Sequence, residues 1–333
     1  MISMGRICMG REEFKEEVKE IIGYKSGLIL DDTDILKFLG ESSSRLWNSE
    51  NLSITLRSEE YEEIVYSVLN GVGYSKKLNP YLSMFNLRNK YKCNEEIMGI
   101  LCDMLQLRND WYKKEVERCI KSGDKKINPV FFIKQSYDKY GELGSKLAYE
   151  IIEDMVEYER CSPYNSVRRV DWTDLIELKD LFKSEGLEAS YGSFIDQRYI
   201  DYLYKNFDND IDLINWRKFE AITCEFFERQ GYKVEIGKGR NDGGIDARIW
   251  KVDNDSKYPT IIVQCKRQKN KVSNTIVKAL YADIEAENAE SGLIVTSTEI
   301  SQSGKKVAKA RGYKIDWCER STLKSWINSM RSL

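Results

Sequence analysis

Apolar residues recur at helical spacing through the first two hundred residues of the chain. Four such stripes are separated by short turns containing glycine, proline or serine, and each stripe is expected to bury one face of a helix. The pattern therefore predicts a mostly α-helical N-terminal region. The stripes are Phe14, Val18, Ile21 and Ile22; Tyr61, Ile64, Val65, Val68 and Leu69; Ile97, Leu101, Met104 and Leu105; and Leu143, Leu147, Ile151, Met155 and Tyr158.

A connecting segment follows over residues 171–205. Its first part, from Asp171, is expected to start a helix with Leu175, Leu178, Leu181 and Phe182 on its buried face. The pattern changes beyond it, so we place a domain boundary near residue 205. This gives a helical region over residues 1–205 and a second domain over residues 206–333.

The second domain alternates between helical and strand patterns in the order αβββαβαβα. This order predicts an α+β or α/β fold, with a mixed sheet covered by helices, in which the first three strands can form a meander. Helices are expected at 216–229, 272–287, 302–310 and 323–330, and strands at 233–236, 245–250, 260–266, 293–296 and 314–317.

Composition narrows the chemistry. The chain of 333 residues is 41% hydrophobic and has no transmembrane run or secretory leader, which predicts a cytoplasmic protein with eight reduced cysteines. It contains no histidine, which excludes Cys/His zinc fingers and any histidine general base. Hydrolysis would have to depend on carboxylates, amides, lysines and a metal ion.

Charge is unevenly distributed along the chain. Residues 206–333 hold 22 Lys and Arg against 18 Asp and Glu, whereas residues 1–205 hold 30 against 36. The excess of four positive charges is compatible with a phosphate-binding surface and equally with an ordinary solvated one.

The strand at 260–266 and the turn before its neighbour carry candidate chemistry. Side chains alternate along a strand, so Gln264 and Lys266 share one face. Gly243 and Gly244 allow positive φ angles in the turn before the strand at 245–250, and Asp246 lies at the start of that strand. Asp242 fits a turn residue better than a ligand. Solvent-facing residues on an edge strand are the alternative for the polar pair.

The helix at 216–229 adds a third acid. Glu220 falls in the apolar stripe formed by Trp216, Cys224 and Phe227, where a carboxylate needs a partner or a metal ion. Glu225 and Glu228 lie off the stripe and are expected to be solvated. Carboxylate and amide oxygens suit Mg²⁺, and a nearby lysine can orient a water molecule and offset charge on a phosphate.

These residues resemble the Mrr-like branch of the PD-(D/E)XK restriction endonucleases, over residues 206–333 only. The resemblance implies that Asp246 is the principal metal ligand, that Gln264 replaces the usual second acid and that Lys266 is the catalytic lysine. It places Glu220 as a helix carboxylate near the metal. The matching stretches are 216–220, 230–234, 241–246, 262–266 and 293–297.

The resemblance implies a DNA endonuclease that uses Mg²⁺, with Mn²⁺ expected to substitute, in restriction or anti-phage defence against foreign or modified DNA. Two alternatives remain: a module that binds DNA or a partner without cutting, and a nuclease acting on RNA or branched DNA. The N-terminal region is expected to recognise a DNA feature, to sense a trigger, or to mediate homo-oligomerisation or contact with a partner protein. Candidate DNA contacts are Arg267, Lys269, Lys271 and Ser297. A solvated loop is the alternative for the three basic residues, and simple helix capping is the alternative for the serine.

Overall fold

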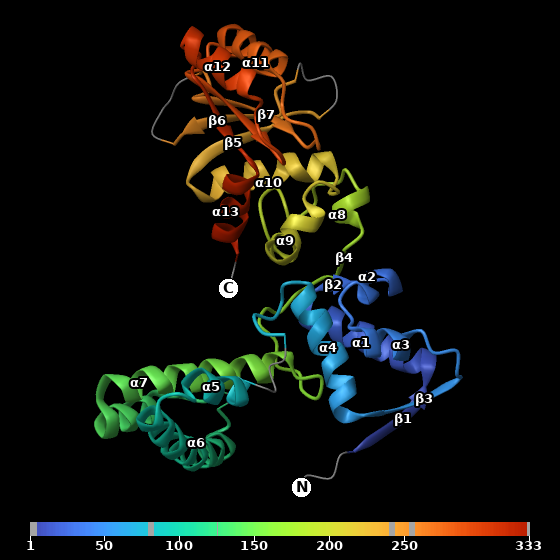
Figure 1. Ribbon diagram of the computed structural model, residues 1–333, viewed down its shortest axis with the longest axis vertical. Helices are drawn as coiled ribbons and strands as arrows, with labels where there is room; N and C mark the ends of the chain where they lie inside the picture. The colour runs from blue at the N-terminus through green and yellow to red at the C-terminus, as the bar shows by residue number, and fades with distance from the viewer. Residues whose placement is uncertain (1–4, 79–82, 125, 240–243, 253–256, 332–333) are drawn as a thin grey trace. The chain divides into compact units, whose positions relative to one another are not determined.

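The computed structural model describes residues 5–78, 83–124, 126–239, 244–252 and 257–331. Asn241, Asp242 and Gly243 of the predicted turn lie outside the described residues. The chain divides into two compact units, one made of residues 1–14, 39–70 and 75–171, and the other of residues 15–38, 71–74 and 172–333 (Figure 1). In the part of the chain that is described, no helix is long and apolar enough to cross a membrane.

The first unit is dominated by helices, as predicted. The long helices α6 (Glu95–Ser122) and α7 (Val130–Cys161) lie side by side with α5 (Ser83–Tyr91), and α3 (Glu41–Trp47) and α4 (Ser58–Gly71) precede them. The α5–α7 core contains Leu101, Met104, Trp111, Phe132, Leu147 and Ile151. One pair of strands was not predicted, because β1 (Arg6–Gly10) and β3 (Ser53–Arg57) pair antiparallel over five residues each.

The second unit begins with α1 (Arg11–Ser26), which starts in the first unit, followed by β2 (Leu28–Ile29) and α2 (Asp32–Leu36). The helix expected from Asp171 is wrong. Strand β4 (Ile176–Glu177) pairs parallel with β2, and only the short α8 (Asp180–Lys183) follows. Long-range hydrogen bonds hold this segment extended, including one from Trp172 Nε1 to the Lys25 carbonyl oxygen. Local apolar spacing is therefore outweighed by tertiary contacts.

The predicted mixed sheet is confirmed, with strand order β5-β6-β7-β8-β9. The first three strands form the antiparallel meander, and β7, β8 and β9 are parallel. The chain enters the sheet through α9 (Gln197–Asp210) and α10 (Trp216–Arg229). The strands are β5 (Tyr232–Ile236), β6 (Ala247–Lys251), β7 (Ile261–Lys266), β8 (Ser291–Thr296) and β9 (Ile315–Cys318).

Helices cover both faces of this sheet (Figure 1). One face packs against α10 and α13 (Arg320–Met330), and the other against α11 (Asn274–Glu287) and α12 (Gln302–Arg311). Ile262 and Ile294 belong to the core beneath α11 and α12, together with Leu280 and Ile284. Helix α10 ends where predicted, and the next residue but one, Gly231, adopts the left-handed φ of 83° that favours glycine.

Candidate metal and catalytic centre

Strands β6 and β7 separate at the position of the predicted site. Their ladder runs from Ile249 opposite Ile261 to Ala247 opposite Val263, and residues 264–266 pair instead with β8 on their other side. Asp246 therefore lies at the fork, one residue before β6 begins. A fork of this kind leaves backbone groups to be satisfied by side chains, and it allows side chains from two strands to converge.

Asp246 satisfies one of these backbone groups. Its amide donates to the Val263 carbonyl oxygen at 2.8 Å, and its Oδ2 accepts a hydrogen bond from the Cys265 amide at 2.6 Å. The side chain thus takes the place of a strand carbonyl where the ladder stops. The carboxylate is buried, with 7% of the residue exposed, so its orientation is set by the sheet itself.

Gln264 is held by the turn that precedes Asp246. Its Nε2 donates to the Gly244 carbonyl oxygen at 3.0 Å, and Gly244 has a left-handed φ of 91°. This bond fixes the direction of the amide and therefore of Oε1. Lys266 lies two residues further along β7, on the same face by strand alternation, and is half-buried.

Glu220 approaches from helix α10. Its Oε2 accepts a hydrogen bond from Arg217 Nη1 at 2.7 Å, and its carboxyl group also shares a hydrogen bond with Asp246. Burial and the neighbouring Asp246 charge raise the pKa of Glu220 to about 8, although Arg217 acts in the opposite direction. The positive charge around Glu220 and Asp246 is therefore too small for both carboxyl groups to be ionised at neutral pH.

These residues fit a hard divalent cation. Gln264 Oε1 is buried and has no hydrogen-bond partner among the described residues, which is costly unless a ligand completes it. Two carboxylates and this amide oxygen are the donors that Mg²⁺ prefers. Within the described ranges no three Asp, Glu, Cys or His side chains cluster, so a metal ion here would depend on the amide as well as the acids.

The expectation that Glu225 is solvated is wrong. Its side chain is 2% exposed, and its Oε2 accepts hydrogen bonds from the amides of Ser193, Phe194 and Ile195. The acid anchors the loop before α9 to helix α10. Glu228, one turn further on, is exposed as expected.

The residues predicted to contact DNA occupy different environments. Lys269 and Lys271 are exposed, and Lys271 pairs with Glu299 at 2.7 Å. Arg267 donates to the Asp212 carbonyl oxygen at 2.7 Å and so braces the segment between α9 and α10. Ser297 is 1% exposed, and its hydroxyl exchanges hydrogen bonds with the Gln268 backbone. The Ser297 side chain therefore joins two loops, and its contact with DNA stays a prediction.

A recess of about 390 Å³ lies beside these loops. Lys269, Lys271 and Arg320 line it, but Glu299 pairs with Lys271 and Asp212 pairs with Arg320. Its charges are largely balanced within the protein.

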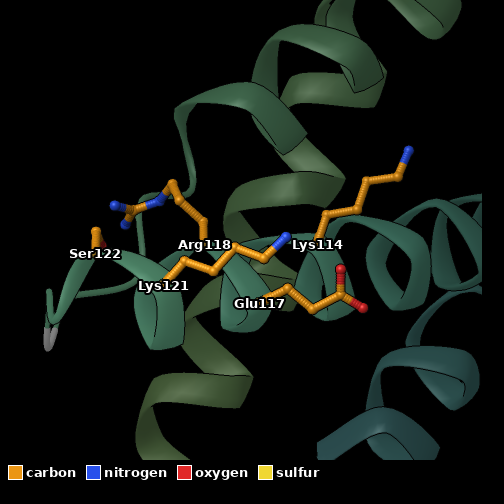
Figure 2. A pocket seen from close by; sticks show the side chains of 5 residues that line it. All are labelled: Lys114, Glu117, Arg118, Lys121 and Ser122. Atoms are coloured by element: carbon orange, nitrogen blue, oxygen red, sulfur yellow. The ribbon is translucent and has the colours of Figure 1, made fainter.

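A second recess, of about 420 Å³, lies in the first unit on the surface of α6 (Figure 2). Lys114, Glu117, Arg118, Lys121 and Ser122 line it. Arg118 is already paired with Glu115 and Asp124. The recess carries basic groups but no arrangement suited to catalysis.

Two features of the site were not identified from sequence. Arg217 lies three residues before Glu220 on the same helix face, a spacing that could have indicated the ion pair. The bond from the Cys265 amide to Asp246 could not be predicted from the sequence, because nearly any residue at that position supplies the same backbone donor.

In a comparison with known protein families, residues 211–327 match the family Mrr_cat, described as restriction endonuclease. Among solved structures, the chain is similar to the MspJI restriction endonuclease in complex with a 27-mer oligonucleotide, at 17% sequence identity and a TM-score of 0.27. That match covers 58% of this chain and 39% of the other. No curated protein matches the chain.

Proposed function

We propose that this chain, whose residues 211–327 match the Mrr_cat restriction endonuclease family, is a Mg²⁺-dependent endonuclease that hydrolyses DNA phosphodiester bonds. Two observations carry the proposal: the buried carboxyl groups of Glu220 and Asp246 are in contact, and the buried Gln264 Oε1 has no hydrogen-bond partner among the described residues. A buried arrangement that is incomplete without a cation has a simple explanation in metal-assisted hydrolysis.

Asp246, Gln264 and Glu220 would hold the ion, with Mn²⁺ able to replace Mg²⁺. A divalent cation bound here would lower the pKa of a bound water molecule and neutralise charge on the scissile phosphate. Asp246 would contribute its carboxylate, which also accepts the bond from the Cys265 amide, and Gln264 would contribute the neutral Oε1. Glu220 must lose its proton before it can bind a cation with full charge.

Lys266 acts on the substrate side of this group. Its ammonium carries three donors on a flexible stem, so it can orient the attacking water and stabilise the charge that develops on the phosphate. The exposed Lys269 and Lys271 lie three and five residues beyond it, after the end of β7, and would contact the DNA backbone. Both act by charge and therefore favour no sequence.

The match to this family favours a role in restriction or anti-phage defence against foreign or modified DNA. Residues 1–205 would then recognise a DNA feature, respond to a trigger, or bring together copies of the chain or a partner protein. We retain residue 205 as the proposed functional boundary. Double-strand cutting with one site per chain favours an oligomer, because two strands need two centres.

The test is cleavage by the full chain of plasmid DNA, methylated plasmid, branched DNA and RNA, each with Mg²⁺, Mn²⁺ or EDTA. We expect metal-dependent DNA cleavage that Asp246→Asn and Lys266→Ala abolish. Asp316→Asn and Lys233→Ala, at exposed positions on β9 and β5, are matched controls that should retain it. Metal-dependent cleavage of RNA and of no DNA substrate would show that the chain is a ribonuclease and not a DNA endonuclease. Binding without cutting in every condition would favour the non-cleaving module.

A further inference from the structure

Arg217 connects the helix side of the site to the backbone of the sheet side. Nη1 donates to Glu220 Oε2 at 2.7 Å, while Nη2 donates to the Gly237 carbonyl oxygen at 2.6 Å. Only 12% of the side chain is exposed, so both acceptors are held away from water. A planar guanidinium can satisfy two acceptors in fixed directions at once, which a lysine ammonium on a flexible stem does less well.

The carbonyl that Arg217 holds is coupled to Asp246. The Gly237 amide donates to the Asp246 carbonyl oxygen at 2.8 Å, directly beyond the last register pair of β5 and β6. One guanidinium therefore fixes the Glu220 carboxylate relative to the backbone that positions the second carboxylate. Neither bond belongs to a regular helix or sheet, so this side chain adds a direct link between the Glu220 carboxylate and the strand backbone beside Asp246.

From this geometry we propose that Arg217 is a positioning residue for the two carboxylates, acting through Glu220 and the Gly237 carbonyl and not through contact with DNA. The inference rests on the proposed function for its consequence in catalysis. Its structural part, the fixing of the Gly237–Asp246 connection, holds for the metal-free protein and is measurable there.

Arg229 provides a matched control on the same helix. Its Nε donates to Glu225 at 2.8 Å and its Nη1 to the Met330 carbonyl oxygen at 2.7 Å. It therefore makes the same kind of bridge, from an α10 glutamate to a distant backbone carbonyl, but at the opposite end of the helix from Glu220. Loss of helix stability alone would affect Arg217→Met and Arg229→Met alike.

The first measurement is amide hydrogen exchange of the full chain in EDTA. We expect the Gly237 amide to exchange about tenfold faster in Arg217→Met, since the Gly237 carbonyl loses its contact with the guanidinium, and to be unchanged in Arg229→Met. Arg217→Lys retains the charge without the double bridge and should resemble Arg217→Met. Unchanged Gly237 exchange in Arg217→Met, or equal acceleration in both methionine variants, would overturn the proposal.

The second measurement separates positioning from DNA contact. Arg217→Met is expected to lower kcat by about 10- to 100-fold, as small misplacements of reacting groups do, with DNA affinity in EDTA unchanged. A loss confined to DNA affinity and KM would make Arg217 a phosphate contact and overturn the inference while leaving the nuclease intact. If the wild-type chain cuts nothing, the proposed function fails, and hydrogen exchange still decides the structural role of Arg217.

Discussion

The Asp246 carboxylate accepts a hydrogen bond from the Cys265 amide at 2.6 Å, at the point where the β6–β7 ladder ends. One oxygen thus substitutes for a missing strand carbonyl, and the charge of the group lies beside Glu220. The same side chain completes the sheet and crowds a second acid. The negative charge of Asp246 is therefore unfavourable for the metal-free fold, because it lies beside Glu220, but it is needed for the proposed metal binding.

Asp246→Asn separates these two demands. An asparagine Oδ1 still accepts from the Cys265 amide, but it removes the charge that opposes ionisation of Glu220. We expect the melting temperature in EDTA at pH 8 to be equal to or above that of the wild type. Cleavage should fall about 100-fold or more, because a principal charged ligand is lost. Parallel unfolding and cleavage assays check this, and lower stability with retained cleavage would contradict it.

The raised pKa of Glu220 predicts how stability changes with pH in the metal-free protein. A folded-state pKa of about 8, above the ordinary value of 4.5, means that the folded chain binds more protons than the unfolded chain between these values. The stabilising effect is therefore complete below pH 4.5 and is lost as pH rises through 8. Urea unfolding in EDTA from pH 5 to 9 should show this decline.

Glu220→Gln should flatten that decline, since an amide does not titrate. Glu228→Gln, which changes an exposed glutamate on the same helix, should leave it as in the wild type. The metal affinity of the wild type should rise over the same interval, because a bound cation must displace the Glu220 proton. An unaltered pH profile in Glu220→Gln would assign the effect to another group.

The sequence predicts this site where its pattern is periodic. Strand alternation places Gln264 and Lys266 on one face, and helix spacing identifies Glu220 as a buried acid, as the structure has it. The order of helices and strands in the second domain is also as predicted.

Predictions from local apolar spacing are wrong where contacts between residues far apart in the sequence determine burial or secondary structure. Glu225 is buried because it binds amides some thirty residues earlier in the chain, and the segment after Asp171 is extended because it pairs with β2. Neither partner is visible from local spacing. The roles of the site residues stay predictions until the variants are measured.

Gln264→Glu tests why an amide occupies this position. The Gln264 Nε2 donates to the Gly244 carbonyl oxygen, whereas a glutamate would direct an oxygen at that carbonyl and add a further buried carboxyl group. We expect a loss of about 1–3 kcal/mol in unfolding free energy in EDTA, the usual effect of an unsatisfied buried polar group. Saturating Mn²⁺ should recover part of this loss.

Gln264→Ala distinguishes the added charge from the lost hydrogen bond. It removes the bond to Gly244 without introducing an acid, so its stability should depend less on pH than that of Gln264→Glu. A Gln264→Glu protein as stable as the wild type in EDTA would show that the turn rearranges to accept a carboxylate.

Arg198 tests how far the nuclease unit depends on residues before 206. Its guanidinium is 1% exposed, donates to Asp196 and to the Gly27 carbonyl oxygen, and lies over the rings of Trp172 and Tyr191. Arg198→Met leaves buried Asp196 without this partner, so we expect a loss of about 3–5 kcal/mol in unfolding free energy. Arg45→Met, which breaks an exposed pair with Glu41, should cost less than about 1 kcal/mol.

The same contacts predict the behaviour of truncated chains. A fragment that begins at residue 206 lacks Arg198 and the loop that Glu225 anchors, so Glu225 would lose its three backbone donors and the packing of that loop on α10 would be lost. We expect it to unfold at lower urea concentration than a fragment beginning at residue 172, measured by circular dichroism. Equal midpoints would show that residue 205 is a boundary of folding, and that residues 172–205 contribute nothing to the stability of the nuclease domain.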